Sequence, residues 1–425
     1  MDFFLRGYSL NGPTWFCLSL LLTTMVFFRC NRVWSLRNFD LVLLLSISTG
    51  LLIVKEDERL GYTWLLVGTA LFLLRLLGDP LFKYRSWLEQ NLNFFGLVFL
   101  GVATFAFLTI KVVTERLPDS TLEVVDRANR LLNLEAISAD ATVAKDSQPD
   151  ITPGPASSLI VALVIPLSKG VVSSNTLPVG PASDFRQISA WIVVILAHFA
   201  VVCGLVLMGR QHFEDVRIGV GMATLYLLLP STVVDVGQVS HVLSAALIVW
   251  AFVAYRRPVA AGGMLGLASG TLFFSVFILP LWALFYTRRR AIRFGLTVGG
   301  VAVVLLGSLW LTSENLHSFV RQIANSINWN AWISRDSAYI IPVGVAFLVL
   351  LIVLSVWPRR KNLEHLLSHS AAIATAVVLA TQFWQPKYGG VYMLWCLPLF
   401  LMVVFRPRLT YLLPQQLRSP KVAEP

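Results

Sequence analysis

Charged residues are scarce in this chain, and that scarcity argues against an ordinary water-soluble protein. Only 13% of the 425 residues are Asp, Glu, Lys or Arg, whereas 56% are hydrophobic. Soluble domains have about a quarter of their residues charged. The sequence therefore predicts a protein whose surface lies largely against lipid.

Cysteine and histidine are also few, and no metal or disulfide motif connects them. Cys17, Cys30, Cys203 and Cys396 lie far apart, without a CxxC pair or a Cys/His ligand spacing. Walker, GxSxG, HExxH and dinucleotide-binding motifs do not occur in the sequence. Because these motifs are missing, we expect no cofactor, and the sequence leaves a metal requirement open.

The net charge of +11 does not indicate nucleic acid, because the basic residues form short clusters between apolar runs. The first residues, MDFFLRGYSLNGPTW, do not have the order of a cleavable signal peptide. We therefore expect a membrane lipid environment as the partner and no nucleic acid.

Apolar runs recur from end to end, with lengths close to the roughly 20 residues that a membrane-spanning helix needs. The predicted spans lie near 11–28, 39–54, 62–78, 92–110, 189–208, 218–234, 241–254, 294–312, 338–357, 366–382 and 391–405. The prediction is an all-α polytopic membrane protein with about 11 to 13 transmembrane segments.

Basic clusters between the spans set the orientation, because cytoplasmic loops are enriched in Lys and Arg. The clusters are Arg29/Arg32/Arg37, Lys83/Arg85, Arg210/Arg217, Arg256/Arg257, Arg288–Arg290/Arg293, Arg359/Arg360/Lys361 and Arg406/Arg408. Placing them inside puts the N-terminus outside and the C-terminus in the cytoplasm. Arg75, near the inner end of a span, is expected to snorkel.

Residues 260–286 lie between two basic clusters, so a single membrane crossing by this segment would place every later basic loop on the outer side. We predict instead two short half-spans that fold back at Gly270–Thr271 and enter and leave from the cytoplasmic side. One long tilted helix is the alternative.

The predicted organisation is a four-span region (1–110), an extracytoplasmic loop (111–188), a membrane core (189–409) and a cytoplasmic tail (410–425). The loop is predicted to begin with an amphipathic helix along the membrane, with Ser120 and Glu123 as a capping box. Its predicted apolar face consists of Leu122, Val125, Leu132 and Ile137. The segment SSLIVALVIPL is predicted to be re-entrant or interfacial.

Asp235, Gln238 and His241 gather polar groups at the outer mouth of two predicted spans. Since Gln238 is three residues from each of the others, a helical turn would bring all three together. Ionisable groups are costly at such depth, which favours a binding site over an ordinary interfacial loop.

The stretch YLLLPSTVVDVGQVSHVLSAALIVWAFVAYRRPVAAGGMLGLAS has a helix ending at Pro230, a loop with Gly237–Gln238, and an arginine-flanked small-residue hairpin. With the late segment FWQPKYGGVYMLWCLPLFLMVV, it resembles the polyprenol-phosphate-sugar-dependent (GT-C type) glycosyltransferases, most closely the mannosyltransferase-like glycosyltransferase family 87. The resemblance covers roughly residues 185 to 405. It implies a GT-C-like fold and sugar transfer from a polyprenyl-phosphate donor on the extracytoplasmic face.

The resemblance also implies a carboxylate near the outer surface that acts as general base on the acceptor. Asp119 is the first candidate and Asp126 the second, with Arg116, Arg127 and Arg130 as possible phosphate partners.

Asp235, Gln238, His241, Lys387 and Tyr388 are the further candidate substrate-binding residues. In the family the hairpin turn carries a lysine followed by proline, whereas this chain reads SGTLFFS. A non-catalytic or structural membrane protein and a transporter or flippase therefore stay open as alternatives.

Overall fold

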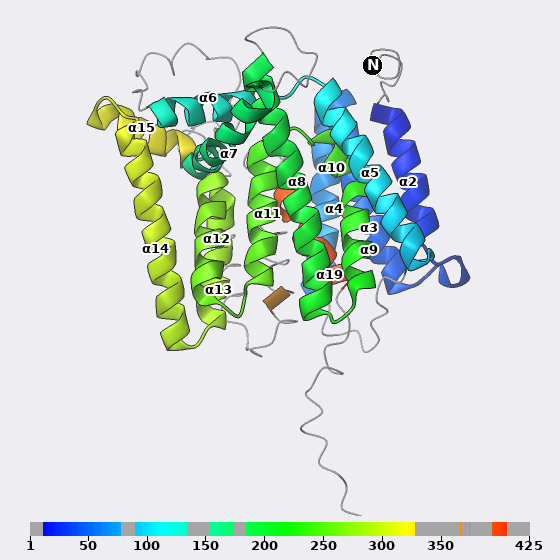
Figure 1. The fold of residues 1–425 in the computed structure, drawn as a ribbon. Helices are drawn as coiled ribbons and strands as arrows, with labels where there is room; N and C mark the ends of the chain where they lie inside the picture. The colour runs from blue at the N-terminus through cyan, green and yellow to red at the C-terminus, as the bar shows by residue number, and fades with distance from the viewer. Residues whose placement is uncertain are drawn as a thin grey trace, which may run out of the picture.

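The computed structural model describes residues 12–77, 90–133, 153–173, 184–327, 366–367, 370, 374 and 393–405. Every regular element in these ranges is a helix (Figure 1), as the composition predicts. The predicted span 338–357, nearly all of 366–382, Lys387, Tyr388 and the tail 410–425 lie outside the described residues.

The N-terminal region contributes helices α2 (Gly12–Phe27), α3 (Leu36–Glu56), α4 (Glu58–Leu77) and α5 (Phe94–Thr114), with the short η1 (Cys30–Arg32) after α2. Their bounds lie within a few residues of four predicted spans. Arg75 of α4 does not snorkel. Its guanidinium is buried and binds the Asp40 carboxylate of α3 through both oxygens, at 2.8 and 3.0 Å. The prediction failed because the partner lies on another helix.

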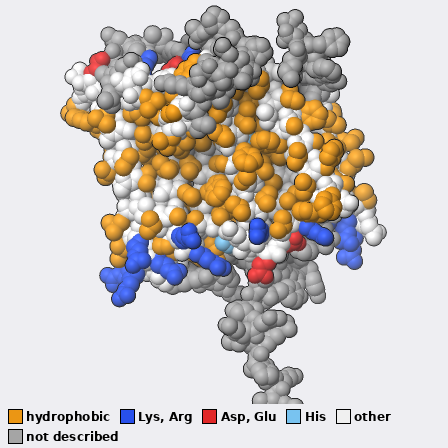
Figure 2. Space-filling view, in the orientation of Figure 1, with side chains coloured by type: hydrophobic (Ala, Val, Ile, Leu, Met, Phe, Trp, Pro, Cys, Tyr) orange, Lys and Arg blue, Asp and Glu red, His pale blue; other side chains and the backbone are white. Residues whose placement is uncertain are grey.

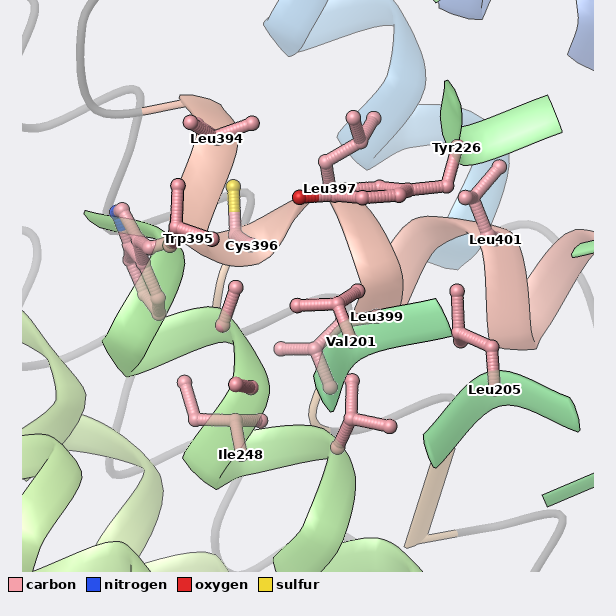
Figure 3. Close-up of a cluster of buried hydrophobic side chains, with 14 of the residues drawn as sticks. Val201, Leu205, Tyr226, Ile248, Leu394, Trp395, Cys396, Leu397, Leu399 and Leu401 are labelled. Carbon is pink, nitrogen blue, oxygen red and sulfur yellow. The ribbon is translucent and has the colours of Figure 1, made fainter. Parts of the chain in front are cut away.

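The core consists of α8 (Asp184–His212), α9 (Val216–Leu228), α10 (Pro230–Val234), α11 (Val239–Val253) and α19 (Met393–Phe405). Figure 3 shows Val201, Leu205 and Ile248 packed against side chains of α19 such as Leu399. The predicted span 218–234 is two helices, because Leu229 before Pro230 is extended (φ −62°, ψ 130°).

Residues 258–286 fold back on themselves, as the charge pattern predicts. Helix α12 (Pro258–Thr271) ends at the extended residue Leu272, and η4 (Phe273–Ile278) with α13 (Leu279–Phe285) returns. The Tyr286 hydroxyl donates a 2.6 Å hydrogen bond to the Tyr255 carbonyl, so the segment starts and ends at the same place. The single long helix is therefore excluded. Helices α14 (Arg288–Leu311) and α15 (Leu316–Ile327) follow.

Helix α6 (Asp119–Asn133) lies across one end of the helix layer, with α7 (Pro155–Ser173) beside it (Figure 1). The surface helix was predicted, but its capping box was wrong, because the Ser120 hydroxyl binds Gln238 instead. Of the predicted apolar face, Val125 is buried, and Thr121, Val124 and Ala128 are buried with it in place of the other predicted residues. Leu122 is only partly buried, Leu132 is 46% exposed, and Ile137 lies outside the described residues.

Among the described residues, four helical segments have the length and composition of a membrane span: Leu36–Val54, Phe94–Thr114, Phe185–His212 and Arg288–Leu311. Large apolar side chains cover the middle of the face drawn in Figure 2, and Phe95, Phe99 and Leu296 are 71–81% exposed. Lys and Arg gather mainly along one edge of this face (Figure 2). Both features are typical of membrane proteins.

Candidate functional site

The loop between α10 and α11 is held by the first turn of α6. The Thr121 hydroxyl donates to the Gly237 carbonyl at 2.6 Å and accepts from the Val239 amide at 3.3 Å. The Ser120 hydroxyl donates to the Gln238 side-chain oxygen at 3.1 Å. Two segments more than a hundred residues apart in the chain are therefore joined through three hydrogen bonds.

Gly237 lets the two segments approach closely. A Cβ atom at this position would lie 2.7 Å from Pro118 Cδ and 3.1 Å from Leu117 Cδ2. Contacts below 3.0 Å are not tolerated without movement. The glycine is thus required by the packing of Leu117 and Pro118 against the loop.

Asp235, Gln238 and His241 follow one another along two linked turns. The Gln238 amide donates to the Asp235 carbonyl at 3.0 Å, and the His241 amide donates to the Gln238 carbonyl at 3.2 Å. Asp235 and Gln238 are half-buried, whereas His241 is 4% exposed. These bonds link consecutive pairs of the three residues along the backbone, and a common site for their side chains stays a prediction. The Gln238 side chain contacts α6 through the Ser120 hydroxyl.

His198 of α8 contacts this loop at Val236, and the sequence analysis did not identify it. Its ring is completely buried, with Nδ1 3.0 Å from the Tyr226 hydroxyl and Nε2 3.1 Å from the Val236 carbonyl. A histidine in the middle of a long apolar run was the available signal, because a polar ring at such depth needs partners.

The two candidate carboxylates of α6 have different surroundings. Asp119 is 72% exposed and lies 3.8 Å from the exposed guanidinium of Arg116. Asp126 lies 2.5 Å from Arg186 of α8. Burial raises the pKa of Asp126, while the charges of Arg186 and then Arg130 act to lower it. Asp119 is therefore the more accessible carboxylate, and Asp126 is engaged in an ion pair.

Of the predicted phosphate partners, Arg127 is already occupied. Its guanidinium binds Glu123 at 2.6 Å and donates to the Pro153 carbonyl at 3.1 Å. These bonds tie α6 to the start of α7. Arg116 is exposed and lies 3.8 Å from Asp119, and Arg130 lies close enough to Asp126 for its charge to act to lower the pKa of that carboxyl.

Helix α7 connects this region to the fold-back segment. The Gly154 amide donates to the Thr271 carbonyl at 3.2 Å, where α12 ends. The Ser157 and Ser240 hydroxyls lie 3.4 Å apart, and those of Ser244 and Ser275 lie 2.7 Å apart. Polar contacts thus run from α6 through α7 and α11 to the turn of the fold-back segment.

The part of the chain that the structure describes has no group of three His, Cys, Asp or Glu side chains arranged to hold a metal ion. Lys387 and Tyr388 lie outside the described residues, so their relation to Gln238 stays a prediction.

Chemically, the first turn of α6 presents the accessible carboxylate of Asp119, with Arg116 near it, next to the loop that carries the Gln238 amide. Such a set can accept a proton from a hydroxyl group and can bind an anion. Comparisons with protein-family models, with curated proteins and with solved structures found no match to this chain.

Proposed function

We propose that this chain is a membrane-embedded glycosyltransferase of GT-C-like architecture. It transfers a mannose-like sugar from a polyprenyl-phosphate donor to an acceptor on the extracytoplasmic face. The observation that carries the proposal is the Ser120–Gln238 hydrogen bond, because it brings the helix that begins at Asp119 onto the loop that carries the resemblance.

The exposed apolar side chains and the four long apolar helices support a membrane location. The basic residues at the opposite end from α6 support an orientation with α6, α7 and the N-terminus outside (Figures 1 and 2). In this orientation the α6–loop contact lies at the outer surface, where a lipid-linked donor presents its headgroup.

Asp119 is the proposed general base, because it is exposed and adjacent to Ser120. It takes the proton of the acceptor hydroxyl while the acceptor oxygen bonds to the sugar carbon and the lipid phosphate leaves. Arg116, three residues before Asp119, is proposed to stabilise the charge on the departing phosphate, whereas Arg130 lies roughly 16 Å further along α6 and belongs with the Asp126 alternative. Asp126 is a weaker candidate, because Arg186 already binds its carboxylate.

The buried charged residues Asp40 and Arg75 give no support to transport. Ionisable residues of a transporter line a path near the bilayer midplane. Here Asp40 and Arg75 form a buried bidentate pair close to the ends of α3 and α4, where the pair joins two helices. The hairpin sequence SGTLFFS, which has no lysine, keeps a non-catalytic protein as the main competing outcome.

The test is transfer of labelled mannose from polyprenyl-phosphate mannose, using the purified full chain in liposomes with acceptor glycans. We expect Asp119→Asn to lower the rate at least about 100-fold, because general bases contribute roughly 10²- to 10⁴-fold. Asp126→Asn should have a smaller effect.

Asp57→Asn is the matched control, because Asp57 is an exposed aspartate that caps α4, and asparagine also caps helices. Its rate should equal that of the wild type. Full activity of Asp119→Asn would exclude Asp119 as the base. Absence of transfer by the wild type from mannosyl, glucosyl and arabinosyl donors would support the non-catalytic protein.

A further inference from the structure

Six arginines converge at the end of the molecule opposite α6. They precede α12 or lie in the first turns of α14 and are called the arginine face here: Arg256, Arg257, Arg288, Arg289, Arg290 and Arg293. All six are exposed. No salt bridge among the described residues involves any of them. Within the described part of the chain, the face is therefore a concentration of positive charge without acidic partners.

The fold-back segment holds the two halves of this face side by side. Tyr286 lies just before the Arg288 cluster, and its hydroxyl binds the carbonyl of Tyr255, just before Arg256. The Phe294 ring of α14 packs parallel to Trp282 at 6.4 Å. A Cβ atom at Gly262 of α12 would lie 2.9 Å from the Phe294 carbonyl, so α12 and α14 touch closely near their starts. The arginines are thus fixed as one surface.

The backbone adds to the positive charge. Helices α12 and α14 both begin at this surface, with Arg257 and Thr287 as N-cap residues that make no side-chain capping bond. A helix N-terminus carries a partial positive charge and favours anions over cations. The first turn of α14 has three arginines and no acidic residue. A bound anion would relieve this repulsion.

The position of the face relative to the apolar surface indicates the source of the anion. Val259, Ile292 and Leu296, within a few positions of the arginines, are 54–71% exposed. Figure 2 shows blue side chains directly beneath orange ones along this edge. An anion bound here would therefore have to sit at the boundary between hydrocarbon and water, where phospholipid headgroups lie.

We propose that the arginine face is a binding site for anionic phospholipid headgroups of the cytoplasmic leaflet. The proposal rests on the proposed membrane location and orientation, and it does not depend on sugar transfer. Binding of one or a few such lipids would anchor the fold-back segment from the side opposite α6.

The experiment measures lipid binding to the detergent-solubilised full chain. Phosphatidylglycerol or phosphatidylcholine is titrated in mixed micelles, and retained lipid is counted by native mass spectrometry at low and high salt. The test variant replaces Arg288, Arg289, Arg290 and Arg293 with Gln. The charge-matched control replaces Arg29, Arg32, Arg210 and Arg217 with Gln. These four arginines are also exposed and lie near the ends of other helices.

We expect the wild type to retain phosphatidylglycerol in preference to phosphatidylcholine, with a preference that weakens as salt rises. The test variant should bind phosphatidylglycerol at least about tenfold more weakly, since each basic residue near an anionic surface contributes roughly 1 kcal/mol. The control should bind phosphatidylglycerol clearly more tightly than the test variant, because its four arginines lie outside the proposed site. Unfolding temperatures in phosphatidylcholine micelles should agree among the three proteins, which verifies folding.

An equal loss of phosphatidylglycerol affinity in the control and in the test variant would overturn the proposed site, because it would show only a general effect of positive charge. Equal retention of both lipids by the wild type would overturn the proposal entirely. Competition by millimolar inorganic phosphate would assign the surface to a soluble anion instead of a lipid. If sugar transfer fails while this lipid preference is present, the proposed catalytic function falls and the lipid site stands.

Discussion

Substituting Gly237 with alanine tests the contact on which the catalytic proposal depends. Glycines with positive φ are absent from the described residues, so the backbone at Gly237 accepts alanine and only the added methyl group matters. That methyl would lie 2.7 Å from Pro118 Cδ, and carbon atoms pack best at about 3.5 to 4.0 Å. The loop and the start of α6 must therefore separate by about 1 Å.

A separation of this size would break the hydrogen bonds that join the segments. The Ser120–Gln238 bond of 3.1 Å would lengthen beyond hydrogen-bonding range, and the Thr121–Gly237 bond of 2.6 Å would be strained. Overpacking costs about 1 to 3 kcal/mol, and a displacement of about 1 Å at a catalytic site costs about 100-fold in rate. We expect Gly237→Ala to lose both stability and most of its transfer activity.

The assay combines the thermal unfolding temperature in detergent with mannose transfer in liposomes. Gly299→Ala is the matched control, because a Cβ atom at Gly299 in α14 meets no atom within 4 Å. Both substitutions restrict the unfolded chain equally. The control should be as stable as the wild type or up to about 1 kcal/mol more stable, since alanine favours helix. A Gly237→Ala protein that behaves like the control would refute the close α6–loop contact.

Three further predictions concern side chains that join helices. Thr121→Val removes a buried hydroxyl while keeping the shape of the side chain, and it leaves the Gly237 carbonyl and the Val239 amide unpaired. The free energy of unfolding, measured by denaturant titration, should fall by about 1 to 3 kcal/mol, and Thr121→Ser should stay near the wild type. Asp126 binds its proton more tightly in the folded chain, so wild-type stability relative to Asp126→Asn should fall as pH rises above the ordinary aspartate pKa. Arg186→Gln should move that fall to higher pH, because it removes the charge that opposes the raised pKa, and an unmoved profile would contradict the ion pair. Asp40→Leu or Arg75→Met alone should cost about 3 to 5 kcal/mol, because each leaves a buried charge without its partner. The double variant with both changes should cost clearly less than the sum, as measured in a double-mutant cycle of unfolding free energies.

Most helix positions could be predicted from the lengths of the apolar runs, because an apolar run of about 20 residues has the length of a membrane-spanning helix. The fold-back of residues 258–286 was also predictable, since two arginine clusters at its ends favour the same side. The break before Pro230 was readable too, because proline disfavours helix at the preceding residue. The spans beyond Ile327 stay predictions, apart from the last one near α19.

The candidate site was predictable only in part, because its contacts join residues distant in sequence. Gly237–Gln238 and the helix at Asp119 could be found from local patterns. The partner of Ser120 could not, since a local capping pattern and a tertiary bond compete for the same hydroxyl. The pairing of Asp126 with Arg186 and the role of His198 likewise depend on how α8 packs.

The hydrogen bond between the Gly154 amide and the Thr271 carbonyl has a consequence for biosynthesis. A ribosome makes residue 154 long before residue 271. When the Thr271 carbonyl at the end of α12 is made, the Gly154 amide that donates to it is therefore already part of the chain. The carbonyl at the end of α12 can therefore be hydrogen-bonded as soon as that helix forms. A circular permutation that moved residues 111–188 behind α14 would reverse this sequence of events, leaving that carbonyl without its donor until translation ended.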